Sequence, residues 1–468
     1  MTQAPAVRPV TVTPPLLLAL HASNPERYPA LFESAATELR KDAATAEPQG
    51  GAIGRFDILF ACPGARLTLH ADQRLTGDSG SETHGTFLDA LDRWWLQERT
   101  ASSDGTPPFT GGWLVYLGYE LAGQIEPCLR LPLGTQGPIA QAVRIPAAII
   151  HARDSGKAWI VAEYDSRSLI ETIAADLAEI TTSPVAQGSL LRADVVEDPT
   201  LDYLSAIERA LEYIAAGDIY QANLSRGWRA HLREGVQPFH LYQRLRQTNP
   251  GPFCALAIID DMAIVSSSPE RLVSVRDGWV ATRPIAGTRP RGMDTASDQN
   301  LARELHTHPK ERAEHVMLID LERNDLGRVC AAGTVSVDEF MTIESYAHVH
   351  HIVSNVRGRL RPGVTPGQTL AAVFPGGTIT GCPKVRCMEI IAELEGQPRG
   401  AYTGSLGYLN RDGSMDFNIL IRSLEVRRDE VVLRAGAGIV ADSIPAHELE
   451  ESRAKARGVL RAFDEALP

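Results

Sequence analysis

The sequence has no concentration of positive charge, no cysteine motif and no long apolar run. Its 468 residues include 46 lysines and arginines against 58 acidic residues, which gives a net charge of -12. Nucleic-acid binding needs clustered positive charge, so we expect no nucleic-acid partner. The six cysteines lack metal-ligand spacing, and Cys382 and Cys387 are too far apart for a CxxC redox motif. We therefore expect reduced, mostly buried thiols.

The first twenty residues contain only a five-residue apolar stretch, at residues 16–20. This stretch is too short for the core of a signal peptide or for a membrane span. We therefore expect no membrane association and a cytoplasmic location. An apolar content of 44% is ample for a buried core, and the length allows two or three domains or one large α/β body.

Strand-like and helical spacings alternate along the N-terminal third. They comprise strand-like runs at 56–69 and 112–121, a hairpin with strands at 147–150 and 158–164, and a helix at 168–180. Residues 181–199 are rich in Ser, Pro, Gly and acidic residues, which is typical of a linker. We predict an N-terminal region at 1–180, a linker at 181–199 and a larger C-terminal domain at 200–464.

The pattern continues beyond the linker. Apolar residues recur at helical spacing from 204 to 214, and Gly217 ends that helix before a strand at 220–226. Two further strands surround a turn at Asp260-Asp261 and lead into Ser268-Pro269-Glu270. The predicted class is therefore mixed α/β (α+β) with large sheets.

The string PIAGTRPRG at residues 284–292 places a glycine turn and two arginines, Arg289 and Arg291, directly after a predicted strand. Guanidinium groups match carboxylates in a bidentate geometry. This string therefore predicts a turn that holds a small anion.

Two predicted helices carry carboxylates. Glu448, Glu451 and Lys455 share one face of the C-terminal helix, and Glu314 stands where a charged helix becomes apolar. Carboxylates that converge without histidine or cysteine ligands favour Mg²⁺. The alternatives are a solvated face for the C-terminal helix and an ordinary ion pair between Lys310 and Glu314.

A glycine-rich loop, FPGGTITGCPK at residues 374–384, places Pro383 like the first residue of a helix. Its free N–H groups would suit a carboxylate, although a plain loop-to-helix connection is the alternative. The loop lacks the GxxxxGK[ST] order, so we predict no nucleotide site. Further along, Arg422 lies on an apolar strand and needs a partner such as a carboxylate. Gly436 and Gly438 expose backbone groups.

These strings, with KERAEHVMLIDLERNDLGR at 310–328, HHIVSNV at 350–356 and ELEESRAK at 448–455, resemble the chorismate-utilising enzymes. That family includes the large subunits of anthranilate synthase and aminodeoxychorismate synthase, with isochorismate and salicylate synthases as cousins. The resemblance covers about residues 201–460 in motif order, and the N-terminal third resembles the two aminating enzymes more weakly. It implies a large two-sheet, β-sandwich-like body with surrounding helices.

The resemblance also implies roles for single residues. Glu270 would protonate the departing C4 hydroxyl of chorismate. His351 would lie near the reacting ring, although a strand histidine is by itself more often structural. Glu314, Glu448 and Glu451 would hold the Mg²⁺ that anchors the ring carboxylate. The residues implied to bind substrate are Ala286, Gly287, Thr288, Thr378, Tyr402, Arg422, Gly436, Gly438 and Lys455.

Gln221 separates the cousins in this resemblance. The isochorismate and salicylate synthases have a lysine at this position, which serves as the base that activates water. A neutral glutamine amide cannot accept that proton. Ammonia is therefore the expected nucleophile.

Four strings look like aminodeoxychorismate synthase: LERN at 321–324, HHIV at 350–353, FPGGTIT at 374–380 and FNI at 417–419. Ala286 points the other way, because the well-known aminodeoxychorismate synthases read PIKGT, and the lysine of that motif attacks C2 of the ring. An alanine methyl group cannot be a nucleophile. Alanine is the anthranilate synthase pattern, although some aminodeoxychorismate synthases also lack the lysine.

The expected reaction is amination of chorismate at C4, towards 4-aminobenzoate and folate. Amination at C2 with loss of pyruvate, towards tryptophan, is the alternative. A catalytically silent binding subunit of the same fold is a third hypothesis.

A separate glutamine amidotransferase is the expected source of ammonia, because the chain has no cysteine of the GxCxG type. Ser34 and the string NPGPF at 249–253 resemble the two walls of a regulatory tryptophan pocket in this family. Both segments could equally be turn and core pieces.

Overall fold

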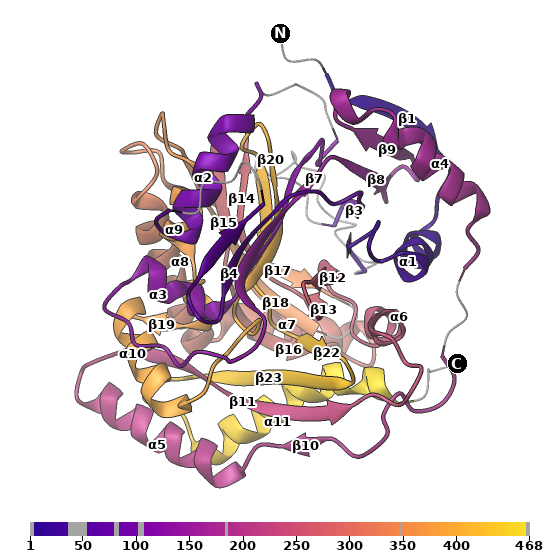
Figure 1. Cartoon of the computed structure of the whole chain (residues 1–468). Coiled ribbons are helices and arrows are strands. Elements are labelled where there is room, and N and C mark those ends of the chain that lie inside the picture. Colours follow the sequence, from indigo (N-terminus) through magenta and orange to yellow (C-terminus); the bar gives the residue numbers. More distant parts are fainter. Residues whose placement is uncertain are drawn as a thin grey trace.

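Two antiparallel sheets form the body of the molecule, and their strands come from both halves of the chain (Figure 1). The computed structural model describes residues 4–35, 54–78, 84–101, 107–182, 186–346 and 349–464. Within these ranges the first sheet has 12 strands and the second has 11. The predicted α+β fold with a two-sheet body is confirmed. No helix in the described ranges is both long and apolar enough to span a membrane.

The first sheet runs across the molecule in a fixed strand order. This order is β1 (Ala6–Val10), β9 (Ala158–Ala162), β8 (Ala147–Ala152), β3 (Phe56–Ala61), β2 (Ala30–Glu33), β12 (Phe253–Ile259), β13 (Met262–Ser268), β22 (Ser423–Arg427), β23 (Glu430–Ile439), β11 (Gln221–His231) and β10 (Val196–Glu197). The short strand β19 (Gly381–Cys382) also pairs with β11.

The second sheet faces the first. Its order is β16 (Ile285–Pro290), β18 (Val349–Arg359), β15 (Trp279–Arg283), β14 (Arg271–Arg276), β21 (Met415–Asn418), β20 (Ser405–Asn410), β6 (Gly112–Leu117), β7 (Pro138–Ile145), β4 (Arg66–His70) and β5 (Leu75–Gly77). In addition, β17 (Ser336–Ser345) pairs with β18.

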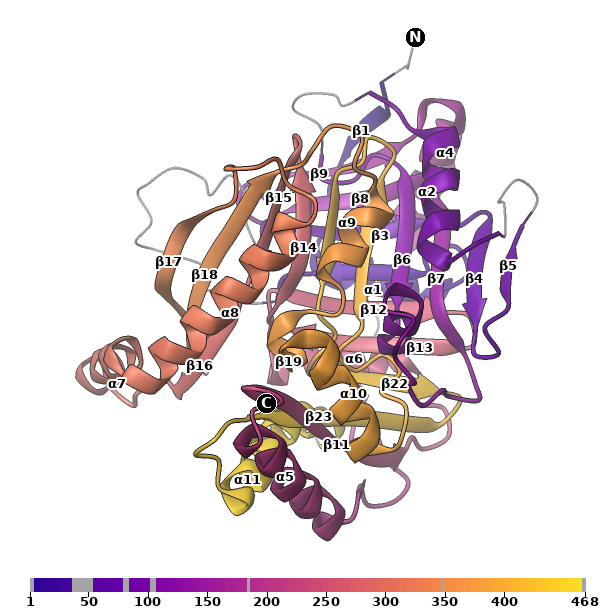
Figure 2. The same ribbon diagram turned by 90° about the vertical axis from the view of Figure 1, so that its left-hand side faces the viewer.

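Helices surround the sheets. They are α1 (Pro14–Ser23), α2 (Phe87–Glu98), α3 (Ala122–Ile125), α4 (Leu169–Glu179), α5 (Thr200–Ala215), α6 (Pro238–Thr248), α7 (Thr295–Thr307), α8 (Pro309–Gly327), α9 (Pro366–Val373), α10 (Lys384–Glu395) and α11 (Pro445–Leu460). Short 3₁₀ turns occur at η1 (Tyr119–Leu121), η2 (Tyr164–Ser166), η3 (Gly377–Ile379) and η4 (Arg461–Phe463). Figure 2 shows α8 lying along β16 and β18.

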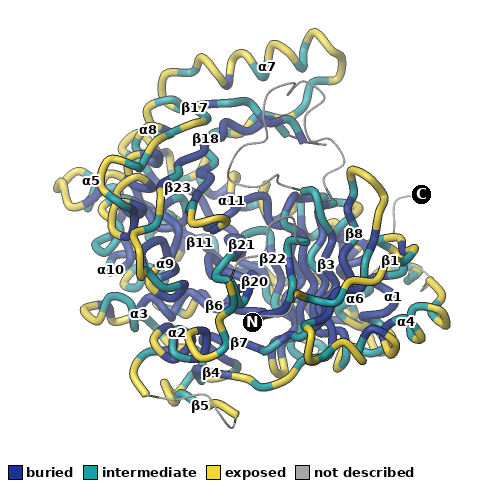
Figure 3. The backbone as a smooth tube through the Cα atoms, turned by 90° about the horizontal axis from the view of Figure 1, so that it is seen from above, coloured by how far each residue is buried: buried dark blue, intermediate teal, exposed yellow. Residues whose placement is uncertain are grey.

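The core has three layers because successive strand residues point to opposite faces. Leu114 and Tyr116 of β6 pack between the two sheets, whereas Trp113 and Val115 pack against the helices that cover the second sheet. Figure 3 shows the strands buried along most of their length, while α7 stands at the rim and buries only Leu305.

Most predicted elements are present. The hairpin is β8–β9, the helices at 168–180 and 204–214 are α4 and α5, and the strands around Asp260-Asp261 are β12 and β13. The run at 56–69 is instead two strands, β3 and β4, which belong to different sheets. The run at 112–121 begins as strand β6 and ends as the 3₁₀ turn η1.

Both sheets contain strands from each side of the predicted linker. Strand β2 pairs with β12 in the first sheet, and β6 pairs with β20 in the second, so each sheet joins strands from before and after residues 181–199. Part of the linker is itself structured, because β10 lies within it and Leu190 is fully buried. The division into an N-terminal region and a C-terminal domain stays a prediction from composition.

Candidate active site

The predicted catalytic acid lies on the segment between β13 and β14. The Glu270 N–H donates to Ser268 Oγ at 3.2 Å, and the Glu270 carbonyl accepts from the Ile419 N–H at 3.0 Å. Its side chain is buried, with 4% of the residue exposed, and accepts a hydrogen bond of 2.7 Å from Thr378 Oγ1. Burial raises the pKa of Glu270 to about 8, and the nearby Glu322 carboxylate adds to the rise. Glu270 is therefore protonated at neutral pH, as an acid catalyst needs to be.

Arg422 lies beside this acid but not on a strand. It occupies the connection between β21 and β22 with φ of 52°, and its carbonyl accepts from the Ser267 N–H at 3.1 Å. The prediction of a strand position is therefore wrong by one residue, because β22 begins at Ser423. The Arg422 cation lowers the pKa of both Glu270 and His351, so these three side chains share one site.

His351 lies on β18 and faces Thr288 on β16. Its Nδ1 is 3.0 Å from Thr288 Oγ1 and 3.4 Å from the Gly287 carbonyl oxygen. Burial lowers the pKa of His351 to about 3, with Arg422 as a second cause, so the ring is neutral. Its Nε2 is buried and has no hydrogen-bond partner within the described part of the chain.

The string PIAGTRPRG forms β16 and not an anion-binding turn. Arg289 pairs with Glu304 and Glu311, and Arg291 binds both oxygens of Asp298 at 2.8 and 2.9 Å. The prediction that these two arginines hold a ligand anion is wrong, because carboxylates of the chain already satisfy them. Ala286 pairs with Ile352 of β18 just before a bulge and is 7% exposed.

Gln221 begins β11 and lies against α8. Its Nε2 donates to Glu314 Oε1 at 3.0 Å, which leaves Oε1 of the amide buried and without a partner among the described residues. A Cβ at position 438 would lie 2.3 Å from Gln221 Nε2, so any larger residue there would displace the amide from this position. The structure thus brings together Gln221, Glu314 and Gly438.

The predicted metal ligands lie on two helices, α8 and α11. Glu451 pairs with Lys455 at 2.8 Å, and Lys455 Nζ also donates to the Gly436 carbonyl at 2.9 Å. Lys310 pairs with Asp442 at 2.9 Å. The alternative of a Lys310–Glu314 pair is therefore wrong, since the lysine turns to a residue far away in sequence.

These carboxylates repel one another. Burial raises the pKa of Glu314 and Glu448, and in both the charge of Glu451 adds to the rise. Within the described ranges, no three Asp, Glu, His or Cys side chains are grouped so that they could hold a metal ion. Mg²⁺ commonly uses one or two carboxylates together with water and substrate, so an open oxygen donor set of this kind fits the ion.

The glycine-rich loop supplies Thr378 from η3. Pro383 is the N-cap of α10 and not its first helical residue, because its ψ of 137° is extended. Lys384 pairs with Asp325 of α8, which ties the end of the loop to the same helix that carries Glu314. Glu322 of α8 was not among the site residues predicted from the sequence, although its carboxylate helps to keep Glu270 protonated.

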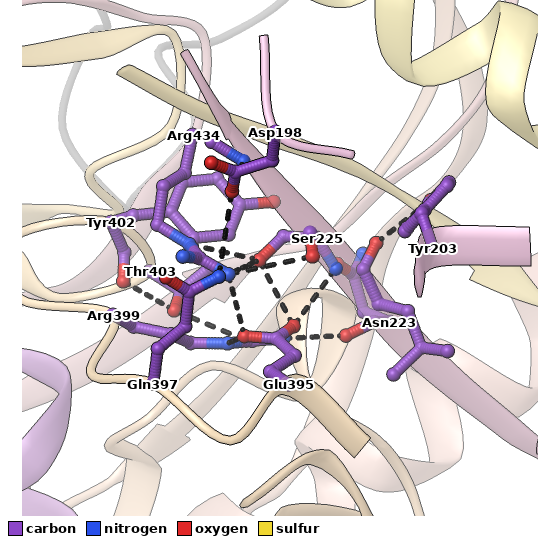
Figure 4. A network of polar contacts seen from close by, with 12 residues as sticks. Asp198, Tyr203, Asn223, Ser225, Glu395, Gln397, Arg399, Tyr402, Thr403 and Arg434 are labelled. Atoms are coloured by element: carbon purple, nitrogen blue, oxygen red, sulfur yellow. Dashed lines mark hydrogen bonds and ion pairs between the residues drawn. The ribbon is translucent and has the colours of Figure 1, made fainter. Parts of the chain in front are cut away.

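Tyr402 lies on a turn after α10, beside a buried network of charges (Figure 4). Glu395 binds Arg399 at 2.6 Å and Arg434 at 2.9 Å. None of these three charged residues was predicted from the sequence to be functional. The one signal in the sequence that could have indicated them is that three charged side chains adjoin apolar elements.

Ser34 is buried, and its hydroxyl has no partner among the described residues. A nearby cavity of about 90 Å³ is lined by Glu33 and by Pro252 and Phe253 of the NPGPF string, but not by Ser34. The role of Ser34 in a regulatory pocket stays a prediction.

Comparison with known proteins identifies the family of the chain. The chorismate binding enzyme family matches residues 49–461. The chain belongs to this family. An aminodeoxychorismate synthase component 1 from Bacillus subtilis is 40% identical over 429 residues, which cover 88% of this chain and 90% of the relative. An anthranilate synthase component 1 from Thermus thermophilus is 51% identical over 264 residues, which cover 56% and 57%.

Solved structures of related enzymes share the fold. Anthranilate synthase component I from Streptococcus pneumoniae TIGR4 has a TM-score of 0.78 at 30% identity, covering 91% of this chain and 96% of that one. The isochorismate synthase MenF from Escherichia coli has a TM-score of 0.72 at 19% identity, and the match covers 99% of this chain and 96% of MenF. This member of the chorismate binding family is thus a chorismate-utilising enzyme, and the two large sheets are the family fold.

Proposed function

We propose that this chain is component I of a cytoplasmic aminodeoxychorismate synthase, which aminates chorismate at C4 to give 4-amino-4-deoxychorismate. The observation that carries amination is the hydrogen bond from Gln221 to Glu314, which holds a neutral amide where water-adding relatives have a basic lysine. An amide cannot deprotonate water, whereas ammonia needs no base to become a nucleophile.

Glu270 supplies the proton in this proposal. Its raised pKa keeps the carboxyl neutral, and Thr378 holds it in place. Protonation lets the C4 hydroxyl leave as water, and a C4–N bond to ammonia replaces the C4–O bond. Arg422, Lys455 and Tyr402 would bind the carboxylates of chorismate.

Mg²⁺ would lie among Glu314, Glu448 and Glu451 and supply positive charge to the ring carboxylate. The mutual repulsion of these carboxylates supports a cation between them. Residues Gln221 and Lys455 then orient two of the three carboxylates through their own hydrogen bonds.

Amination at C2 with loss of pyruvate is the second candidate. Ala286 favours it, because the position lacks the lysine of many C4-aminating enzymes. In either reaction an alanine methyl group excludes a covalent lysine adduct at this position. The B. subtilis aminodeoxychorismate synthase covers 88% of this chain at 40% identity, and two anthranilate synthases cover the same share at 36% and 39% identity, so coverage favours neither carbon.

A separate glutamine amidotransferase would deliver ammonia. The relatives named component 1 support a second component. Ammonia is mostly ammonium at neutral pH, so the isolated chain should need alkaline ammonium salts.

One incubation separates the candidates. Purified chain is mixed with chorismate, Mg²⁺ and an ammonium salt at alkaline pH. We expect a product that an added lyase converts to 4-aminobenzoate. Fluorescent anthranilate together with released pyruvate would instead establish C2 amination, and chorismate binding without turnover would establish a silent subunit.

A further inference from the structure

The turn that carries Tyr402 has a strained backbone. Gly400 and Thr403 have φ of 60° and 64°, in the left-handed region. A Cβ at position 400 would lie 2.4 Å from Glu425 Oε1, so a carboxylate approaches the turn closely. The position of Tyr402 therefore depends on what binds this backbone.

The buried carboxylate of Glu120 and the half-buried carboxylate of Glu425 bind three successive N–H groups of the turn. Glu120 Oε1 accepts from the N–H groups of Arg399 at 2.7 Å and of Gly400 at 3.2 Å. Glu425 Oε1 accepts from the Ala401 N–H at 2.6 Å. The Tyr119 N–H donates to the Gly400 carbonyl at 2.9 Å, so η1 and the turn are joined in both directions. A segment of the N-terminal third thus holds a residue of the candidate active site.

The Arg399 side chain transmits this position to the Tyr402 ring. Its guanidinium lies 4.8 Å from the Tyr119 ring centroid and 5.5 Å from the Tyr402 ring centroid. Glu395 and the Asn223 carbonyl bind the same guanidinium, each at 2.6 Å (Figure 4). An arginine held by several acceptors has little freedom, so a shift of its backbone moves the tyrosine.

Glu120 itself is 6% exposed and pairs with no lysine or arginine side chain among the described residues. Burial raises the pKa of Glu120 to about 7, while the N–H groups of the turn lower it. The groups that interact with it are Tyr116 of β6, Tyr119, the Arg399 backbone and Glu425 of β22, while Arg427 lies beside Tyr116 and Glu425. Its charge changes near neutrality, which gives the contact a pH signature.

We propose that Glu120 is a positioning residue, which sets the place of Tyr402 for chorismate through the 399–401 backbone and the Arg399 side chain. The inference rests on the proposed function in one respect, that Tyr402 contacts chorismate. It holds for amination at either carbon, because both reactions bind the same substrate.

The test measures chorismate binding by calorimetry with Mg²⁺ and without ammonia. Glu120→Gln should weaken binding about tenfold at pH 8, the loss expected for a charge-assisted hydrogen bond. Glu126→Gln is the matched control, since Glu126 follows in the same segment and only approaches Arg328 at 4.0 Å. In a double-mutant cycle, the double variant should lose less chorismate-binding free energy than the sum of the losses in Glu120→Gln and in Tyr402→Phe.

The pH dependence separates positioning from a general loss of structure. Glu120 is ionised above about pH 7, so the parent should bind chorismate more weakly as the pH falls from 8 to 6. This step should be absent in Glu120→Gln. If that variant does not fold, Glu120→Asp can replace it. The shorter side chain keeps the charge but moves it away from the N–H groups of the turn, so binding should weaken while the pH step remains.

Additive effects in the cycle would overturn the inference but not the proposed function. The same holds if Glu120→Gln keeps both the affinity of the parent and its pH step. A parent chain that binds no chorismate would overturn the proposed function and the inference with it.

Discussion

The hydroxyl group of Thr378 donates a hydrogen bond of 2.7 Å to Oε1 of Glu270. This contact joins the glycine-rich loop to the acid of the candidate site. It stabilises the ionised carboxyl, whereas burial and Glu322 favour the neutral one, and burial prevails. The balance between these causes can be tested residue by residue.

Glu270→Gln should reduce turnover by about 10²- to 10⁴-fold, the usual contribution of a general acid. Chorismate binding should persist, because the glutamine amide has the same size and can still accept the Thr378 hydrogen bond. Steady-state kinetics and calorimetry check the two halves. Glu430→Gln, an exposed change on β23, serves as the control. Turnover within tenfold of the parent would refute the acid role.

The pH profile of turnover should fall above about pH 8, as Glu270 loses its proton. The assay must hold the concentration of free ammonia constant. Thr378→Val removes a hydrogen bond that lowers the pKa of Glu270, so the alkaline limb should move to higher pH. Thr369→Val, at a buried threonine whose hydroxyl donates to the Thr365 carbonyl, should leave the limb in place. A limb that moves to lower pH would contradict this account.

Glu270 should also make stability depend on pH. Its pKa rises from the ordinary 4.5 to about 8 in the fold, so the native state retains a proton that the unfolded chain loses. Its contribution is complete below about pH 4.5 and is lost as the pH rises through about 8. Urea unfolding of Glu270→Gln should therefore show a stability relative to the parent that rises between pH 5 and pH 9. A difference that stays constant would mean that the carboxyl has an ordinary pKa.

Glu395→Gln should destabilise the fold by about 3–5 kcal/mol, because it leaves two buried guanidinium groups without their anion. Arg399 and Arg434 both bind this carboxylate. Chemical denaturation measures the free energy of unfolding. Glu171→Gln removes the exposed Arg8 pair and should change it by no more than about 0.5 kcal/mol. Equal effects of the two changes would refute the argument from burial.

Glu451→Gln should raise the Mg²⁺ concentration for half-maximal activity by at least about tenfold. Its carboxylate raises the pKa of both Glu314 and Glu448, which places it electrostatically among the proposed ligands. Glu450→Gln is the matched control, because Glu450 is the neighbouring residue on α11 and pairs with Arg453. A Mg²⁺ requirement equal in both variants would remove Glu451 from the site.

Local periodicity predicted many elements correctly. The spacing of apolar residues located α5, and alternation with a turn located the β8–β9 hairpin. Neighbours in the same element provide these signals, so the sequence contains them directly. The run at 56–69 shows the limit, since nothing local indicates that β3 and β4 join different sheets.

Side-chain partners were predicted less well, because they come from other elements. Arg289 and Arg291 looked available for a ligand, but Glu304 of α7 and Glu311 of α8 pair with Arg289, and Asp298 of α7 pairs with Arg291. Lys310 looked like the partner of Glu314, but Asp442 takes it. Spacing along one helix cannot reveal a competitor that lies more than a hundred residues away.

The sequence by itself determined which chemical groups are available. Gln221 supplies an amide where a base would be needed to activate water, and Ala286 offers no nucleophile, and no fold can alter either fact. Only the tertiary structure decided the states and positions of these groups. Burial keeps the proton on Glu270, and η1 brings Glu120 to the turn of Tyr402. A pKa and a contact across 279 residues depend on what surrounds a group, which exists only once the chain has folded.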